Sequence, residues 1–463
     1  MRNFGRLFLM TVAVLPAWAG GLDDPFATDQ HLPLKPSPRL MARVGEAPCA
    51  TALPASPLTA IDAVDLMLCN HPQTREVWAA ARVQAATLGV ARAGWLPTLS
   101  GSAGTTRFEY ENSAYTRNSA AITLSWLLYD FGQRSANIEN AEQLLQAAAA
   151  TQDATVQTLF LGALQAFYSA QATRAAVSSA LQAERSARES FQAAEARYKV
   201  GVATPADRLQ AQTAFSQATL NRIRAEGEAR NALGTLANAL GFNAQQAIVL
   251  ADLPALPVGS SFQKEVDALI AEAQARRPDL RAAEAQVRAA QASVDVARAQ
   301  GRPTISLGAG PSWQESAGVT QQGGSLGLTL NVPIFSGFDT TYRVRSAAAQ
   351  AEVRAAQRDR IRNQVALDVW KAYQSLSTAT QSLQTTADLV ASAEQSERVA
   401  LGRYKAGVGT ILDVLNAQSA LAAARVQRIQ AALDWYVSRA ALAKAVGTLD
   451  NRLLNPAADI PIP

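Results

Sequence analysis

Residues 197–207 read RYKVGVATPAD and residues 403–413 read RYKAGVGTILD, 206 positions further along the chain. Extended to residues 212 and 418, ten of the sixteen aligned positions are identical. The same offset pairs Pro72 with Pro278 and Gly241 with Gly447 without a gap. The chain therefore contains two copies of one unit, and a period of this length, present only twice, excludes a solenoid of short repeats.

Most of each copy is predicted to be helical. Residues 61–95 have a helical pattern that Pro97 ends. Residues 134–200 and 340–406 contain no proline, so each predicts one helix about 100 Å long at about 1.5 Å per residue. A returning helix over 205–240 follows the first of them. Since the two shorter helices together match the long one in length, we expect them to lie end to end along it.

One β-hairpin interrupts the helices of each copy, at residues 98–129 and 304–335. Its strands alternate apolar and small polar residues, which is the period of a strand with two different faces. In the second copy Leu326, Leu328 and Leu330 share one face and alternate with glycine and threonine. We expect polar loops at 111–118 and 315–324 to join the strands of each hairpin.

Composition excludes several classes of function. Alanine makes up about a fifth of the chain, which is typical of closely packed long helices and not of several globular cores. The net charge of +4 is mild and its cations are scattered, which argues against nucleic acid as a partner. Two histidines, His31 and His71, and two cysteines, Cys49 and Cys69, are too few for a zinc site. We expect no metal, no cofactor and no enzymatic activity, because no nucleophile, base and acid gather in the sequence.

The N-terminus predicts export. Residues 1–19 combine two arginines, a short apolar run and a final Ala-Trp-Ala, as a signal peptide does. The run has about 13 apolar residues, whereas a membrane-spanning helix needs about 20. In an oxidising compartment Cys49 and Cys69 could form a disulfide, and two unpaired buried thiols are the alternative.

The chain then divides into four parts after the signal peptide. We expect an N-terminal extended segment at 20–60, a first structural repeat at 61–255, a second at 256–447 and a C-terminal tail at 448–463.

Four strands cannot close a barrel, and an open sheet edge cannot lie in lipid. If the strands cross a membrane, the chain must oligomerise, and three copies would supply twelve strands around a wide lumen. The predicted fold class is mainly α with a β-barrel part. Two alternatives remain open: a small sheet in water, and a periplasmic coiled-coil scaffold without a barrel.

Two stretches carry a resemblance to a known family. Residues 407–417 read GVGTILDVLNA and residues 445–449 read AVGTL. With the duplicated helix and hairpin pattern, they resemble the TolC family of outer-membrane efflux proteins over essentially the whole mature chain. The resemblance implies a homotrimer with a twelve-stranded barrel in the outer membrane and a helical tunnel crossing the periplasm. It also implies a periplasmic adaptor protein and an inner-membrane transporter as partners.

The resemblance also suggests a substrate class. Residues 69–75, which read CNHPQTR, are similar to family members that serve type I protein secretion. This favours export of a protein toxin of the adenylate cyclase-haemolysin (cyclolysin) kind, with an ABC transporter supplying the energy. Drug efflux driven by a proton-coupled pump is the alternative.

The resemblance places candidate sites at the two glycine turns. Gly201 with Thr204, and Gly407 with Thr410, would present grooves to the periplasmic adaptor, while glycine is also needed for the tight reversal itself. Asp413 matches a position that forms a charged ring at the tunnel entrance in the family, although capping of the following helix is an alternative role.

The chain departs from the family pattern at two positions, Asn416 and Gly409, and resembles it in one further pair of residues. A second aspartate of the entrance ring is replaced here by Asn416. Tyr404 and Asp207 resemble a pair that holds the closed state together, and the arginine that joins this latch in the family is replaced by Gly409.

Overall fold

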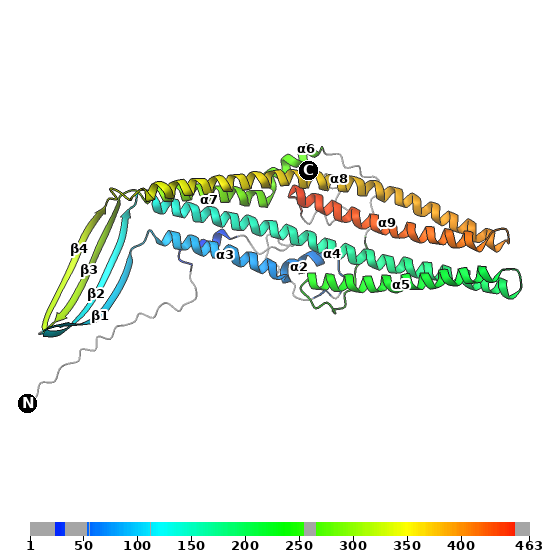
Figure 1. Cartoon of the computed structure of the whole chain (residues 1–463), viewed down its shortest axis with the longest axis horizontal. Helices are drawn as coiled ribbons and strands as arrows, with labels where there is room; N and C mark the ends of the chain where they lie inside the picture. Colours follow the sequence, from blue (N-terminus) through cyan, green and yellow to red (C-terminus); the bar gives the residue numbers. More distant parts are fainter. Residues whose placement is uncertain (1–23, 33–52, 55, 112, 254–264, 450–463) are drawn as a thin grey trace, which may run out of the picture.

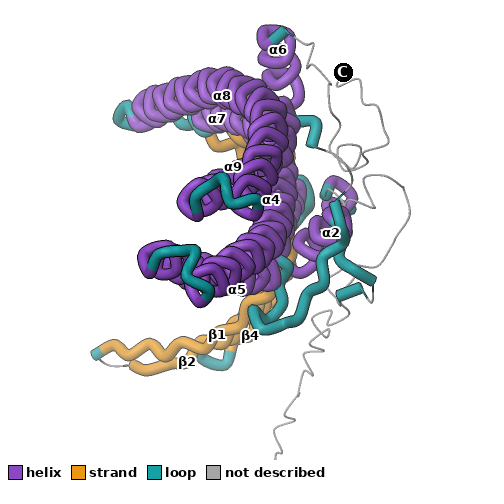
Figure 2. The backbone as a smooth tube through the Cα atoms, turned by 90° about the vertical axis from the view of Figure 1, so that its right-hand side faces the viewer, coloured by secondary structure: helices purple, strands orange, loops and turns teal. Residues whose placement is uncertain are grey.

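The computed structural model describes residues 24–32, 53–54, 56–111, 113–253 and 265–449. Long helices lie side by side along one axis, and a four-stranded sheet leaves them at one end (Figure 1). Seen along that axis, the helices follow a curved wall and not a solid bundle (Figure 2). The predicted signal peptide, Cys49 and most of the predicted C-terminal tail lie outside the described residues.

The first repeat contains four helices. They are α2 (Ala60–Asn70), α3 (Pro72–Ala93), α4 (Gln133–Lys199) and α5 (Pro205–Ala239). The prediction of one continuous helix over 61–95 is wrong, because the chain turns between α2 and α3 at His71, whose φ of −66° and ψ of 130° are extended. A proline disfavours helical backbone in the residue before it and is well accommodated at the first position of a helix.

The second repeat has the same order of helices as the first. They are α6 (Val266–Arg276), α7 (Pro278–Ala299), α8 (Asp339–Lys405) and α9 (Ile411–Val446). A short 3-10 turn, η1 (Thr28–His31), precedes the first repeat. Both predicted long helices are confirmed, since α4 and α8 have 67 residues each. α3 and α5 pack along successive parts of α4, and α4 also packs on α7 and α9 (Figure 1).

The sheet is formed by both repeats. Its strands are β1 (Thr98–Tyr110), β2 (Ser113–Tyr129), β3 (Thr304–Ser316) and β4 (Val319–Asn331). All neighbours are antiparallel in the order β1-β2-β3-β4, so β1 and β4 each have one unpaired edge within the chain. The predicted hairpins are confirmed, and the fold class is that expected: mainly α with a part of a β-barrel.

The expected polar loops are much shorter than predicted. β3 and β4 pair up to Ser316 and Val319, which leaves only Ala317 and Gly318 between them. Both have positive φ, 49° and 82°, the conformation of a two-residue turn that matches the twist of the strands. Polar side chains at 114–118, 315–316 and 319–324 therefore belong to strands that continue beyond the apolar band, and polarity alone does not distinguish such strands from loops.

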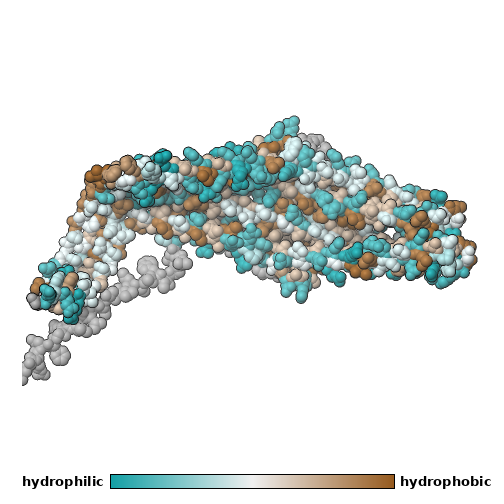
Figure 3. Space-filling model, viewed as in Figure 1, coloured by the Kyte–Doolittle hydropathy of each residue, from teal (hydrophilic) through white to brown (hydrophobic). Residues whose placement is uncertain are grey.

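Hydrophobic packing between the helices is distributed in several clusters. One joins α2, α4 and α5 around Phe160 and Phe167, and another joins α6, α8 and α9 around Val369 and Trp435. Many of the buried residues are alanines, which lets the helix axes approach closely. No helix within the described ranges is both long and apolar enough to cross a membrane. Figure 3 shows hydrophobic residues gathered at the corner where the sheet meets the helices and hydrophilic residues at the far tip of the sheet.

Candidate functional site

The turn between α4 and α5 lies at the end of the molecule opposite the sheet (Figure 1). Gly201 has a φ of 81°, and the Val202 amide donates to the Arg197 carbonyl at 2.9 Å, which closes the C-terminus of α4. Thr204 and Asp207 then form a capping box: the Thr204 side chain accepts from the Asp207 amide, and the Asp207 carboxylate accepts from the Thr204 amide at 2.9 Å. Local capping chemistry thus fixes this reversal.

The turn between α8 and α9 repeats this geometry at the same end. Gly407 has a φ of 82°, and the Val408 amide donates to the Arg403 carbonyl at 3.0 Å. Thr410 and Asp413 form the second capping box, in which the Asp413 carboxylate accepts from the Thr410 amide at 3.1 Å. A Cβ on Gly407 would meet nothing within 4 Å, so the positive φ, and not crowding, is what requires glycine.

An arginine of the first repeat joins the two turns. Arg197 donates from Nη1 to the Tyr404 carbonyl at 2.7 Å, and its guanidinium carbon lies 4.8 Å from the centre of the Tyr404 ring. Tyr404 is buried in a cluster with Ala194, Ala211 and Ile411, which come from three other helices. This contact was not predicted from the sequence, because Arg197 is followed by the same Tyr-Lys pair as Arg403 and nothing local distinguishes the two arginines.

The two residues of the expected latch are close but not bonded in this structure. The Tyr404 hydroxyl has no hydrogen-bond partner among the described groups, and the Asp207 carboxylate is used in its capping box. Burial raises the pKa of the Tyr404 phenol, the Arg197 charge lowers it, and the Asp207 charge raises it. A Cβ on Gly409 would lie 3.0 Å from the Arg403 Cβ, so a larger side chain at this position would have to displace its neighbours.

The expected entrance residues lie on the first two turns of α9. Asp413 and Asn416 are both exposed. Hydrogen bonds from the Thr410 amide and hydroxyl lower the pKa of the Asp413 carboxyl, so the carboxylate is negative at neutral pH. It therefore caps α9 and remains available as a surface charge; one role does not exclude the other.

A buried ion pair was not predicted and lies where the first repeat enters the sheet. Arg134 Nε lies 3.0 Å from the Asp130 carboxylate, and both side chains are at most 7% exposed. The same guanidinium donates to the carbonyls of Gly94, Leu127 and Leu128 and lies 4.1 Å from the centre of the Trp95 ring. All five donors of an arginine can be used in such a fork. We call this cluster the Arg134 junction.

The second repeat has a different solution at the same place. Gly301, Ser336 and Thr340 occupy the positions that correspond to Trp95, Asp130 and Arg134. The Ser336 and Thr340 hydroxyls are 3.3 Å apart, and a Cβ on Gly301 would lie 2.6 Å from the Thr340 methyl. Around them Ile334, Phe335 and Phe338 are 94%, 75% and 63% exposed. The difference between the two junctions is visible when the repeats are aligned, because Asp130 and Arg134 align with Ser336 and Thr340.

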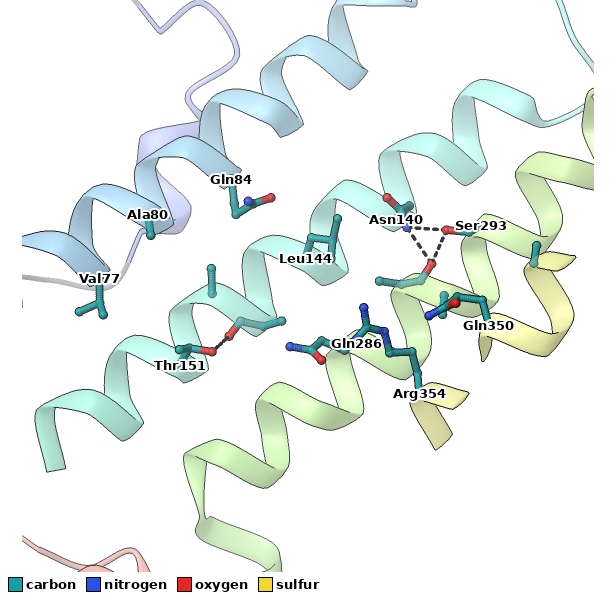
Figure 4. A pocket seen from close by; sticks show the side chains of 15 residues that line it. Val77, Ala80, Gln84, Asn140, Leu144, Thr151, Gln286, Ser293, Gln350 and Arg354 are labelled. Carbon is teal, nitrogen blue, oxygen red and sulfur yellow. Dashed lines mark hydrogen bonds between the residues drawn. The ribbon is translucent and has the colours of Figure 1, made fainter. Parts of the chain in front are cut away.

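A hollow of about 610 Å³ lies where both repeats meet, between α3, α4, α7 and α8. Asn140 donates from Nδ2 to the Ala289 carbonyl at 2.7 Å and to the Ser293 hydroxyl at 2.9 Å, which ties α4 to α7 (Figure 4). Most other polar side chains around it are uncharged amides and hydroxyls, and Arg354 is the charged residue in the lining. Nothing here resembles a catalytic arrangement.

The remaining candidates concern metals and cysteines. In the part of the chain that the structure describes, no group of three or more histidine, cysteine, aspartate or glutamate residues could hold a metal ion. His71 caps α3, since its Nδ1 accepts from the Gln73 amide at 3.2 Å. Cys69 is disulfide-bonded, and Cys49, the other cysteine of the chain, falls outside the described residues.

Comparison with known proteins gives three similarities. The profile of the family described as "Outer membrane efflux protein" matches residues 63–242 and 269–448, one segment in each repeat. Protein CyaE of Bordetella pertussis is 32% identical over 421 residues, which cover 88% of this chain and 89% of that protein. The outer membrane efflux protein BepC of Brucella suis is 26% identical over 385 residues, covering 82% and 83%.

Solved structures agree with the fold. The outer-membrane channel OprN superposes with a TM-score of 0.74 at 22% identity, covering 84% of this chain and 90% of that one. At this identity the likeness concerns the fold, which combines the same long helices and strands.

Proposed function

Because the chain belongs to the outer membrane efflux protein family, which comprises channel proteins of the outer membrane that extend into the periplasm, we propose that it is the outer-membrane duct of a type I secretion system for a protein toxin. Its similarity to CyaE over nearly the whole length of both chains supports this choice. Efflux of small molecules is the second candidate, and the similarity to BepC favours it. In either case an adaptor in the periplasm and a transporter in the inner membrane would be the partners.

Deletion of the gene in a strain that secretes the toxin tests the choice. We expect the toxin to disappear from the medium and to return when the intact gene is supplied, while accumulation of a fluorescent dye in the cells stays unchanged. Raised dye accumulation with normal secretion would instead support efflux. A protein that does not fractionate with the outer membrane as an oligomer would contradict both.

The working unit is proposed to be a homotrimer. The unpaired edges of β1 and β4 support this, since three copies supply twelve strands, enough to enclose a lumen. Within one chain, Asn140 on α4 meets Ser293 on α7. The residue equivalent to Asn140 in the second repeat is Ser346 on α8, and the residue equivalent to Ser293 in the first repeat is Thr87 on α3. Both are exposed. We therefore expect Ser346 of one protomer to lie beside Thr87 of the next.

Cysteine cross-linking tests that arrangement. A short bis-maleimide added to the Thr87→Cys/Ser346→Cys variant should give covalent species of up to three chains on a denaturing gel. The matched pair Asn140→Cys/Ser293→Cys should be linked within one chain, and Thr87→Cys alone should give no ladder. Linkage within one chain only, in both pairs, would contradict the trimer.

The glycine turns are proposed as the adaptor-docking surface, formed by Gly201, Thr204, Gly407 and Thr410. They lie together at the end opposite the sheet, where a periplasmic partner would reach them. Gly407→Val should abolish cross-linking to the adaptor while trimers persist, because a β-branched residue resists a φ of 82°. Gly402→Val is the control: Gly402 is exposed, and its added Cβ meets nothing within 4 Å. Equal cross-linking of both variants would refute docking at the turn.

Asp413 and Asn416 are proposed to line the tunnel entrance, and Tyr404 and Asp207 to hold its closed state. A single carboxylate per chain should make the entrance less cation-selective than a ring with two. Asp413→Asn removes the charge but keeps an oxygen for the capping box, whereas Asp413→Ala removes both. If the charge matters, the two variants change single-channel conductance in planar bilayers alike; a change in the alanine variant alone would leave only the capping role.

A further inference from the structure

The register of the sheet assigns every strand residue to one of two faces. Trp126 lies opposite Leu307, which lies opposite Leu328, and Leu124 lies opposite Leu99 and Ala309. This face is apolar over the half of the sheet next to the helices. In an outer-membrane channel an apolar band of this kind faces lipid, so the other face lines the lumen.

The luminal face is almost free of charge. Most of the described strand residues on this face carry small or hydroxyl side chains or amides, from Thr98 and Ser125 beside the helices to Gln314 and Gln321 toward the tip; Leu127 and Val319 are its aliphatic residues of larger size. Of the described strand residues on this face, Arg117 is the one that is charged. Such a surface offers little for a passing molecule to bind.

One cluster at the far tip of the sheet interrupts this surface. Phe108 lies directly opposite Tyr115 on the luminal face, with ring centres 5.1 Å apart, and Tyr110 stacks on Tyr115 at 6.3 Å. The Arg117 guanidinium carbon lies 4.6 Å from the centre of the Phe108 ring. We call these four residues the exit cluster.

Arg117 has capacity left for a ligand. Its Nε is covered and has no hydrogen-bond partner among the described residues, so a ligand would reach the guanidinium at its two Nη groups, neither of which bonds to a described residue. The carboxylates at the same level, Glu109 and Glu315, belong to the opposite face, since Glu109 pairs with Ala114 and Glu315 with Asn118 and Thr320. An unpaired cation that is held against an aromatic ring is suited to bind a carboxylate.

The exit cluster lies at the end of the sheet most distant from the helices (Figure 1). As the helices extend into the periplasm, that end opens to the exterior. We propose that the exit cluster binds an extended polypeptide that carries carboxylates as it leaves the channel. The aromatic faces contact its apolar side chains and Arg117 pairs with its acidic groups. This rests on the proposed function, in which three copies place three such clusters around one mouth.

Current recordings on the purified channel in planar bilayers test the proposal. The probe is an unstructured 30-residue Gly/Ser peptide with six glutamates and three leucines, added on the side of the sheet tip. We expect it to block the current transiently, and Arg117→Gln to shorten the blockades by about fivefold, in keeping with solvent-accessible ion pairs in three copies. A peptide with lysines in place of the glutamates should block the intact channel more briefly.

Arg107→Gln is the matched control, because Arg107 pairs with Thr116 on the opposite face at almost the same height. It should leave the blockade times unchanged. Equal times for Arg117→Gln and the intact channel, or equal shortening by both variants, would overturn the proposal. Blockades by a small anionic dye, and none by the peptide, would also overturn it. A protein that forms no conducting oligomer would instead contradict the proposed function itself.

Discussion

The two places where the repeats enter the sheet show how one duplicated backbone acquired two surfaces. In the first, the Arg134 junction closes on itself: a buried guanidinium is paired with Asp130 and bonded to three carbonyls. In the second, two hydroxyls replace the ion pair, and Phe335 and Phe338 project from the corner. The polar groups of the first junction find their partners within the chain, although Trp95 and Tyr129 beside it are 45% and 52% exposed. The second junction leaves more apolar surface, which another copy can cover.

Replacement of Arg134 should have the largest effect of the changes that test this contrast between the junctions. Arg134→Met leaves Asp130 buried without its cationic partner and removes the guanidinium bonds to three carbonyls, so we expect the free energy of unfolding to fall by about 3–5 kcal/mol. Guanidinium unfolding of the detergent-solubilised protein, followed by tryptophan fluorescence, measures it.

The counterpart in the second repeat is the control for this loss. Thr340→Val removes one hydroxyl of the Ser336 pair and should lower the free energy of unfolding by only about 1 kcal/mol. Comparable losses in Arg134→Met and Thr340→Val would show that the junctions are equivalent, contrary to our interpretation.

The exposed corner should have the next largest effect, on assembly and not on folding. Phe335→Ser/Phe338→Ser removes apolar surface that we expect to be buried between protomers, at about 2 kcal/mol for each aromatic side chain. Sedimentation velocity in detergent should show a shift from trimer to monomer, while circular dichroism shows the same helix content as the intact chain.

Val319→Ser is the control for the corner, because Val319 is also exposed, at 61%, and lies at the far end of β4. We expect its trimer to remain intact. If both variants dissociate alike, the corner has no special part in assembly.

The contrast between the junctions also indicates what the sequence could predict. The tip turns were predictable because their determinants are local: a glycine with positive φ followed by a Thr-x-x-Asp capping box, present twice. The break at His71 was missed although Pro72 was visible, because the surrounding hydrophobic pattern continues across it. The Arg134 junction depends on Trp95, which is distant in sequence and meets Arg134 only after the sheet has formed.

The two glycine turns differ between the repeats in the burial of one tyrosine, and this difference should have the smallest effect. Tyr404 is buried beside Arg197, whereas Tyr198, its counterpart in the first repeat, is 40% exposed. Burial raises the pKa of the Tyr404 phenol above its ordinary value. The folded state therefore holds this proton more tightly than the unfolded state. The stability from this group is fully present below about pH 10, the ordinary pKa of tyrosine, and is lost as the pH rises through the raised value.

Replacement of each tyrosine separates the two tips. Because the Tyr404 hydroxyl has no partner among the described groups, Tyr404→Phe should change the melting temperature little at pH 8 and should reduce the loss of stability above about pH 10. Tyr198→Phe should keep the alkaline loss of the intact chain. Melting temperatures of the intact chain, Tyr404→Phe and Tyr198→Phe at pH 8 and above about pH 10 measure this difference. A large loss at pH 8 in Tyr404→Phe would mean that the hydroxyl is bonded in the assembled channel, which is what a latch with Asp207 requires.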